Sequence, residues 1–253
     1  ALIALLLFAL TLTIASLVST GKIDPEAYES GTLLFTKDFF WYNAAVLVFL
    51  AAVCRVLRAA RVSDRLIRRP TGRLLVLTAI AGLLWILLTK AQPAGEQQYL
   101  FDAAKAIIKG KTKDLVRESG SLYFYFATSP NQFGNLAYVE LLTRVFGAKG
   151  ILIAAPALNV LLLVLSYASI LKTTGRLFRD NRVTLLALLL LCVSFQPLLL
   201  CTAIDAGFFG AALTVWSIGR MVQYIQYGKK SNLVWGAVLV ALAAAFGTVG
   251  RAA

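Results

Sequence analysis

The sequence contains no histidine and only three cysteines among its 253 residues. Cys54, Cys192 and Cys201 lie in or at the edge of apolar segments, and no two of them have CxxC spacing. Zinc sites are built mainly from cysteine and histidine, and a disulfide framework needs paired cysteines at characteristic spacings. The composition therefore excludes a zinc centre and a disulfide-stapled domain.

Acidic residues are also scarce, with 12 against 25 basic residues and a net charge of +13. In a soluble protein this imbalance would suggest nucleic acid as a partner. Here the basic residues fall between apolar runs, where they are typical of membrane topology signals and of contacts with anionic lipids. We therefore expect membrane lipids as partners, and no nucleic acid.

Apolar residues are abundant: 59% of the chain is hydrophobic. Soluble domains have roughly 45–50% apolar residues. Several apolar runs approach or exceed the length of about 18 residues that a transmembrane helix needs. The sequence predicts an all-α fold, a polytopic transmembrane helical bundle of about seven spans with interfacial helices in a long outer loop. The expected spans are 2–19, 39–58, 73–90, 150–171, 183–203, 206–226 and 233–250.

The arrangement of charges predicts which loops face outward. The strongest basic cluster runs from Arg55 to Arg73, and the positive-inside rule places it in the cytoplasm. Alternation then places segment 91–149 outside, and the basic segments 172–182 and 226–230 inside. This requires that residues 131–147 do not span the membrane but lie on its outer surface or re-enter it.

Two acids and one arginine reach this outer face. Glu96 follows the third expected span in "AQPAGEQQYLFDAAKAIIKG" (91–110), and residues 97–109 predict an amphipathic helix that ends at Gly110. A carboxylate is favoured before the first turn of a helix, so Glu96 has a structural alternative to a chemical role. Arg251 reaches the same face near the end of the chain.

Asp205 stands in "LLLCTAIDAGFFGAAL" (198–213) with almost no polar neighbours in sequence. An ionisable residue between two membrane spans is costly, and this makes it a candidate functional residue. The alternative is that Asp205 only marks a tight outer turn. Asn159, buried within its span, is expected to join helices and not to bind a ligand.

Three segments in this order resemble the GT-C superfamily of polytopic membrane glycosyltransferases, which use sugars linked to polyprenyl phosphate. The nearest resemblance is to bacterial enzymes related to protein O-mannosyltransferases and lipid A aminoarabinose transferases. The matching segments are Gly95-Glu96-Gln97 with the following "AA" and "I..G", then "TSPNQFGNLAYVELLTRVFG" (128–147), and finally Asp205. The resemblance divides the chain into residues 1–72, with two spans and a basic cytoplasmic loop, and residues 73–253, a GT-C-like catalytic module that is incomplete at its C-terminus. The sequence departs from the family in having Glu96 where aspartate is usual.

The resemblance implies an inverting transfer from a polyprenyl-phosphate sugar to a hydroxyl of a glycan, lipid or protein acceptor, on the outside of the bacterial plasma membrane. Glu96 would be the catalytic base and Asp205 would orient the acceptor, and both could hold a divalent cation such as Mg²⁺ or Mn²⁺. The implied substrate-binding residues are Gln97, Tyr99, Lys105, Gln132 and Arg251. A transporter or lipid flippase is an alternative, although no internal repeat is visible. A non-catalytic membrane assembly subunit is another.

Overall fold

The computed structural model describes residues 19–23, 33–37, 44–45, 48, 51–52, 55–56, 62–90, 92–93, 95–111, 126, 132–194 and 196–246. The chain divides into two units, residues 1–61 and 62–253. Nearly all of the expected span 2–19 and most of the expected span 39–58 lie outside the described residues. The division expected at residue 72 follows from the resemblance and stays a prediction.

The first unit contains a short β-ribbon that the sequence analysis did not predict. Strands β1 (Ser19–Ile23) and β2 (Leu33–Lys37) pair in antiparallel register, with Ser19 opposite Lys37 and Ile23 opposite Leu33. The residues "LLFTK" of β2 mix aromatic, β-branched and aliphatic side chains that suit a pleated surface. These strands fall in a segment that was expected to be a loop.

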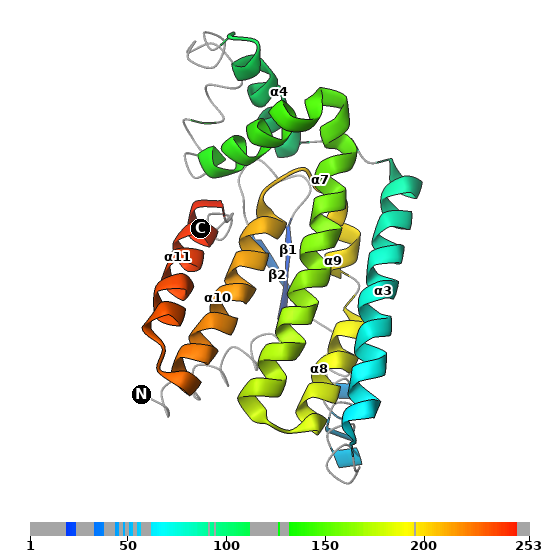
Figure 1. The fold of residues 1–253 in the computed structure, drawn as a ribbon. Coiled ribbons are helices and arrows are strands. Elements are labelled where there is room, and N and C mark those ends of the chain that lie inside the picture. Colours follow the sequence, from blue (N-terminus) through cyan, green and yellow to red (C-terminus); the bar gives the residue numbers. More distant parts are fainter. Residues whose placement is uncertain are drawn as a thin grey trace. The chain divides into compact units, whose positions relative to one another are not determined.

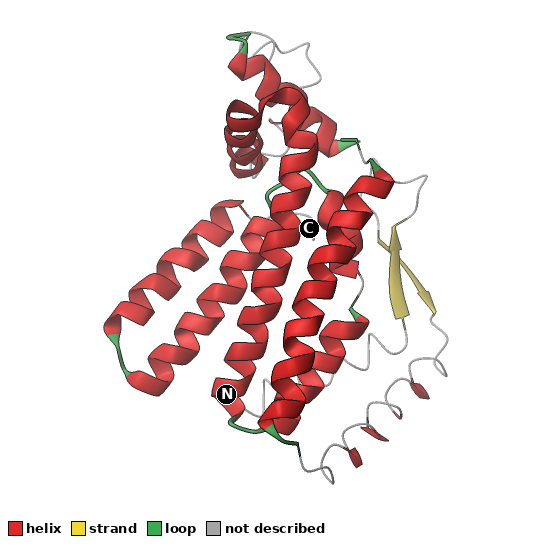
Figure 2. Ribbon diagram, turned by 45° about the vertical axis from the view of Figure 1, so that its right-hand side comes forward, coloured by secondary structure: helices red, strands yellow, loops and turns green. Residues whose placement is uncertain are grey.

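The second unit is helical throughout its described residues, and the predicted helical class is confirmed there. Figures 1 and 2 show α3, the longer part of α7, α10 and α11 lying side by side. The elements are α3 (Asp64–Thr89), α4 (Glu96–Ile108), α7 (Phe133–Phe178), α8 (Asn181–Val193), α9 (Gln196–Leu199), the 3-10 helix η2 (Leu200–Thr202), α10 (Gly207–Tyr227) and α11 (Lys230–Phe246).

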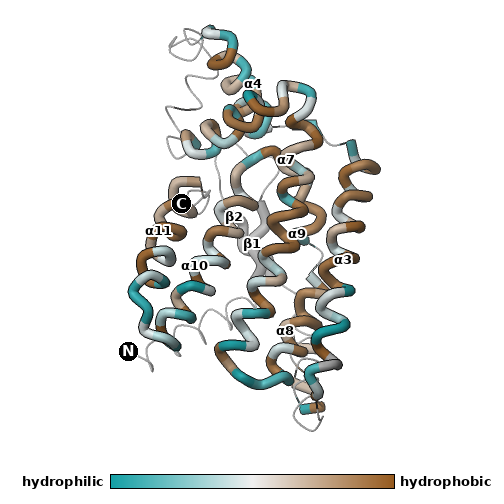
Figure 3. The backbone as a smooth tube through the Cα atoms, viewed as in Figure 1, coloured by the Kyte–Doolittle hydropathy of each residue, from teal (hydrophilic) through white to brown (hydrophobic). Residues whose placement is uncertain are grey.

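Two helices in the described part are long and apolar enough to cross a membrane: Ile67–Thr89 of α3, and α7. A third span results if α8 and the segment Gln196–Thr202, bent by 44° from each other, count as one. Figure 3 shows the hydrophobic residues along α3 and the longer part of α7. These helices are compatible with a membrane protein, whereas the full count of about seven spans stays a prediction.

Helix α7 is broken at Gly147, which has φ 73° and ψ 167°. A positive φ of this kind is open to glycine and costly for other residues. Figure 1 shows the part before the break turned away from the axis of the part after it. The expectation that 131–147 forms a helix separate from the span 150–171 is therefore confirmed, and its side of the membrane stays a prediction.

Two expected boundaries were wrong. Helix α3 begins at Asp64, so residues 64–72 belong to its first turns and not to a loop. The expected span 183–203 is interrupted after Val193. Pro197 favours a break here, because it has no N–H to donate to the carbonyl of Val193 four residues earlier. The Tyr167 hydroxyl of α7 donates to the carbonyl of Ser194 at 3.2 Å, which satisfies one backbone group at the break.

Candidate functional site

Helix α4 is the first element of the candidate site, and its predicted form is confirmed. The N–H of Gly110 donates to the carbonyl of Ile107 at 3.0 Å, and that of Lys111 donates to Ala106 at 2.9 Å. With Gly110 at φ 69°, this pair of bonds is a Schellman motif, which ends the helix where the sequence indicated. The apolar face of α4 is covered by protein: Leu100, Phe101, Ala103 and Ala104 are buried in one cluster with residues of α7 before its break.

Asp205 lies in the turn between η2 and α10. Its Oδ1 accepts the backbone N–H of Gly207 at 2.8 Å, which satisfies one of the free N–H groups at the start of α10. A Cβ on Gly207 would lie 2.9 Å from the same oxygen, so glycine fits this position. Asp205 therefore has the turn-forming role that the sequence allowed. Its second carboxylate oxygen, Oδ2, faces Gln97.

Gln97 joins α4 to this turn. Its Nε2 lies 3.5 Å from Oδ2 of Asp205, and its Oε1 accepts the backbone N–H of Ile204 at 3.2 Å. The two predicted site residues are 108 positions apart in the chain. One amide side chain therefore connects the first segment of the resemblance to the third.

The second segment reaches the same turn through Gln132 and Asn135, which are both buried. The Asn135 amide donates to Oε1 of Gln132, and its Oδ1 accepts the backbone N–H of Ala206 at 3.2 Å. The N–H groups of Ile204, Ala206 and Gly207 thus each have a side-chain acceptor. Sequence reasoning named Gln132 and missed Asn135, although two amides three residues apart at the start of a helix are a usable signal.

Two further side chains surround the turn. Asn159, from α7 after the break, donates to the carbonyls of Cys201 at 3.1 Å and Ala203 at 2.7 Å, so it joins two segments as expected. Tyr138 is 6% exposed, and its ring stacks on Phe209 of α10 with centroids 5.8 Å apart. The Tyr138 hydroxyl has no hydrogen-bond partner within the described part of the chain.

Of the remaining predicted residues, Lys105 has its described contacts within α4. Lys105 pairs with Asp102 at 3.2 Å and lies 3.7 Å above the ring of Phe101. Tyr99 lies on α4 and is 40% exposed. Glu96 begins α4, directly beside Gln97, but its side chain lies outside the described residues, as does Arg251.

The predicted divalent cation stays a prediction. Among the described side chains, no three metal-ligating residues come together. The one described carboxylate here, Asp205, accepts a backbone N–H and faces an amide. Mg²⁺ is usually held by one or two carboxylates together with substrate phosphates. The described donor set alone does not make such a site.

A cavity of about 380 Å³ lies between the end of α3 and α7 after its break, with Thr202 of η2 in its lining. Lys90 and Lys149 lie in its wall together with apolar side chains, including Leu152 and Pro156. Neither lysine is in an ion pair within the described residues. Sequence reasoning missed both lysines, because their approach depends on how α3 packs on α7.

The fold and the site define a helical protein with membrane-compatible helices, in which three polar segments far apart in sequence meet at the turn 204–207. No family model, curated protein or solved structure matches this chain.

Proposed function

We propose that this chain is a membrane glycosyltransferase of the GT-C kind, which moves a sugar from polyprenyl phosphate to an acceptor hydroxyl on the outer face of a bacterial plasma membrane. One observation carries the proposal. Two of the three segments that resemble this superfamily contact the turn 204–207 through Gln97 and Asn135, and the third, with Asp205, forms that turn. Each motif is weak alone, and their convergence supports treating them as one site.

In the proposed reaction, a carboxylate removes the proton of the acceptor hydroxyl. The acceptor oxygen then bonds to the anomeric carbon of the sugar, and the bond from that carbon to the phosphate oxygen breaks with inversion. The electron pair leaves with the lipid phosphate. Glu96 is the base by position, since it precedes Gln97 on α4, and Asp205 orients the acceptor. A positioned general base typically accelerates such a step by about 10²–10⁴-fold.

The leaving phosphate needs positive charge, and the cavity beside Thr202 supplies it. Lys90 and Lys149 provide two ammonium groups, and Leu152 and Pro156 provide apolar wall for a prenyl chain. Cations aimed at the place where negative charge develops stabilise the transition state. Lys105, a substrate-binding residue implied by the resemblance, is engaged by Asp102.

The test compares Glu96→Gln and Asp205→Asn in the purified protein, assayed with a panel of polyprenyl-phosphate sugars. We expect transfer to fall about 100-fold or more in Glu96→Gln, and by a smaller factor in Asp205→Asn. Asparagine keeps an oxygen that can accept the Gly207 N–H, so the turn should persist. Asp102→Asn is the matched control, because Asp102 is a carboxylate on the same helix that pairs with Lys105.

Wild-type turnover in both site variants would contradict the proposal. So would an equal loss in Asp102→Asn, because that result would mean that any charge change on α4 disturbs the protein. A second variant, Lys90→Gln with Lys149→Gln, should lower kcat/KM for the lipid donor by about tenfold or more, because two cations that face the leaving phosphate are lost.

A further inference from the structure

A second and larger cavity, of about 610 Å³, lies between α7, α10 and α11. Its lining comes from the end of α7, the second half of α10 and the first half of α11, so it lies away from the turn 204–207. Figure 1 shows the part of the unit where α7 and α10 end and α11 begins. Lys172 and Arg176 of α7 and Arg220 of α10 line this cavity, and Trp216 and Trp235 lie in its wall.

The cavity is strongly cationic. Lys172 and Arg176 are four residues apart and therefore share a helix face, and Arg220 comes from the facing helix. No aspartate or glutamate lines the cavity, and in the described residues the ion pairs are Lys105–Asp102 and Arg144–Glu140. Arg220 donates to Oδ1 of Asn232 at 3.4 Å, a neutral group that leaves its charge unneutralised. The three cations therefore repel one another, and a bound anion would relieve that repulsion.

The walls of the cavity are held by hydrogen bonds between the helices. The Gln226 amide of α10 donates to the carbonyl of Arg176 at 2.6 Å, and the Ser217 hydroxyl donates to the carbonyl of Gly236 on α11 at 2.9 Å. At Gly219, an added Cβ would lie 3.1 Å from Oγ1 of Thr173, so glycine allows α10 to approach α7 closely. The cations are therefore held in place by packed helices, and binding of a ligand would not require the helices to rearrange.

We propose that this cavity binds a phosphate group, either that of an anionic lipid or that of a soluble phosphate. Guanidinium groups offer paired N–H donors that match phosphate oxygens, and the hydroxyl of Thr173 adds a further donor. Basic cavities between membrane helices bind anionic head groups, and tryptophan is enriched at head-group depth. Trp235 is 56% exposed, as a side chain beside a lipid would be. This binding is independent of the proposed transfer reaction.

Tryptophan fluorescence provides the readout, because two of the four tryptophans line the cavity. The experiment uses a variant with Trp41→Phe and Trp85→Phe, so that the fluorescence comes from Trp216 and Trp235. One arm titrates detergent-solubilised protein with brominated phosphatidylglycerol, a quencher with an anionic head group, against brominated phosphatidylcholine. The other arm titrates inorganic phosphate and follows the emission and the thermal midpoint.

The decisive variant is Arg176→Gln with Arg220→Gln, and its matched control is Lys229→Gln with Lys230→Gln. The control removes two exposed cations that follow α10 in the chain and do not line the cavity. Each basic contact contributes about 1 kcal/mol, so we expect affinity to fall about thirtyfold in the arginine pair. The control should change by about twofold or less, because neither lysine lines the cavity and charges at a distance from the ligand are screened at physiological salt.

Stronger quenching by phosphatidylglycerol than by phosphatidylcholine, lost in the arginine variant only, assigns the site to a lipid head group. A response to inorganic phosphate without that lipid preference, again lost only in the arginine variant, assigns it to a soluble phosphate. No response of the wild type to either ligand would overturn the proposal, as would equal losses in the variant and the control. If the glutamine pair fails to fold, Arg176→Lys with Arg220→Lys carries the test, since it keeps the charge and loses the paired donors, and an intermediate affinity is expected.

Discussion

Two regions of the helical unit differ in how their polar side chains are paired. At the turn 204–207, amides and a carboxylate satisfy one another and the backbone, through Gln97, Asn135 and Asp205. In the large cavity, three cations gather without a carboxylate in its lining. Buried polar groups are normally paired within the protein. The first region is therefore organised by its own bonds, whereas the cations Lys172 and Arg220 of the second are exposed and open to an anion.

The largest expected effect comes from a substitution that disrupts the helix packing that supports the turn 204–207. A Cβ on Gly134 of α7 would clash with the carbonyl oxygen of Ala245 on α11, which is backbone and cannot rotate away. Overpacking of this kind costs about 1–3 kcal/mol or more. We expect Gly134→Ala to lower the free energy of unfolding by about 3 kcal/mol, measured by thermal or denaturant unfolding in detergent.

The matched control is Gly72→Ala in α3, where an added Cβ would meet nothing within 4 Å. Alanine is favoured over glycine inside a helix by about 0.5–1 kcal/mol, so this variant should be as stable as the wild type or more so. Equal stability of the two alanine variants would contradict the close approach of α7 and α11.

The second effect tests whether the turn depends on one buried amide. Asn159 is fully buried and donates to the carbonyls of Cys201 and Ala203. Asn159→Leu would leave both carbonyls without this donor, at a cost of about 2 kcal/mol. Asn181→Leu is the comparison, because Asn181 bonds to Asp64 and Val62 in a less buried place and should cost about 1 kcal/mol or less. A larger loss in Asn181→Leu would mean that Asn159 is not the main support of the turn.

The sequence correctly predicted the helix ends that depend on only a few neighbouring residues. Gly110 ends α4 because a positive φ and two backbone bonds suffice there, and Gly147 separates two helices for a similar reason. The break after Val193 was also visible in principle, since Pro197 has no N–H to donate to the carbonyl of Val193. The early start of α3 was not predicted, because the arginines that suggested a loop are also good helix formers.

The candidate site was predictable only where residues share a motif. Gln97 and Asp205 were named from the sequence, but their contact depends on how α4 packs on α7. Lys90 and Lys149 come together across two helices, and no spacing along the chain reveals such a pair. In the large cavity, Lys172 and Arg176 come from a segment interpreted as a topology signal, and Arg220 comes from an expected membrane span. Their shared position follows from tertiary packing alone.

A smaller effect is expected from repulsion among the cations of the large cavity. If Lys172, Arg176 and Arg220 repel one another when no anion is bound, Arg176→Gln with Arg220→Gln should stabilise the lipid-free protein at low salt. We expect a gain of about 0.5–1 kcal/mol, which should shrink as salt is added. Unfolding measured at several salt concentrations checks both the sign and the screening. Arg220 also donates to Oδ1 of Asn232 at 3.4 Å, so a loss of stability at every salt concentration would mean that this bond outweighs the repulsion and would contradict the prediction.

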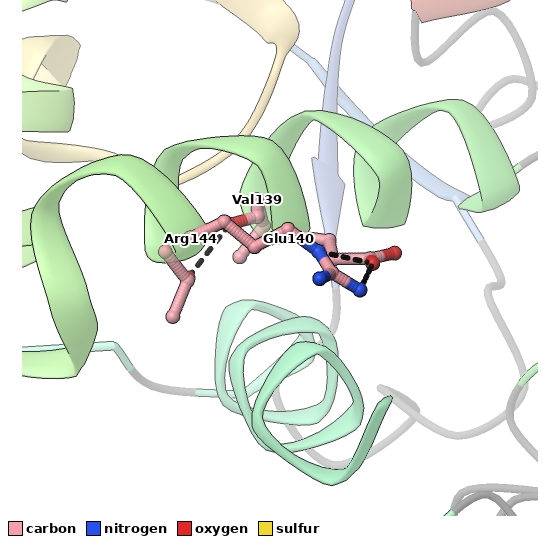
Figure 4. A network of polar contacts seen from close by, with 4 residues as sticks. Val139, Glu140 and Arg144 are labelled. Atoms are coloured by element: carbon pink, nitrogen blue, oxygen red, sulfur yellow. Dashed lines mark hydrogen bonds and ion pairs between the residues drawn. The ribbon is translucent and has the colours of Figure 1, made fainter. Parts of the chain in front are cut away.

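The smallest effect concerns an ion pair that belongs to neither region. Figure 4 shows Arg144 of α7 bound to Glu140 one turn earlier, with Nε at 2.9 Å and Nη2 at 2.7 Å from Oε1. The arginine side chain is 55% exposed, and exposed pairs four residues apart contribute about 0.3–0.5 kcal/mol. We expect Arg144→Gln to cost no more than this in unfolding experiments and to leave sugar transfer unchanged, because the pair closes within one helix. A loss of transfer in Arg144→Gln with unchanged stability would instead place this arginine in the site, as its position in the 128–147 segment alone would allow.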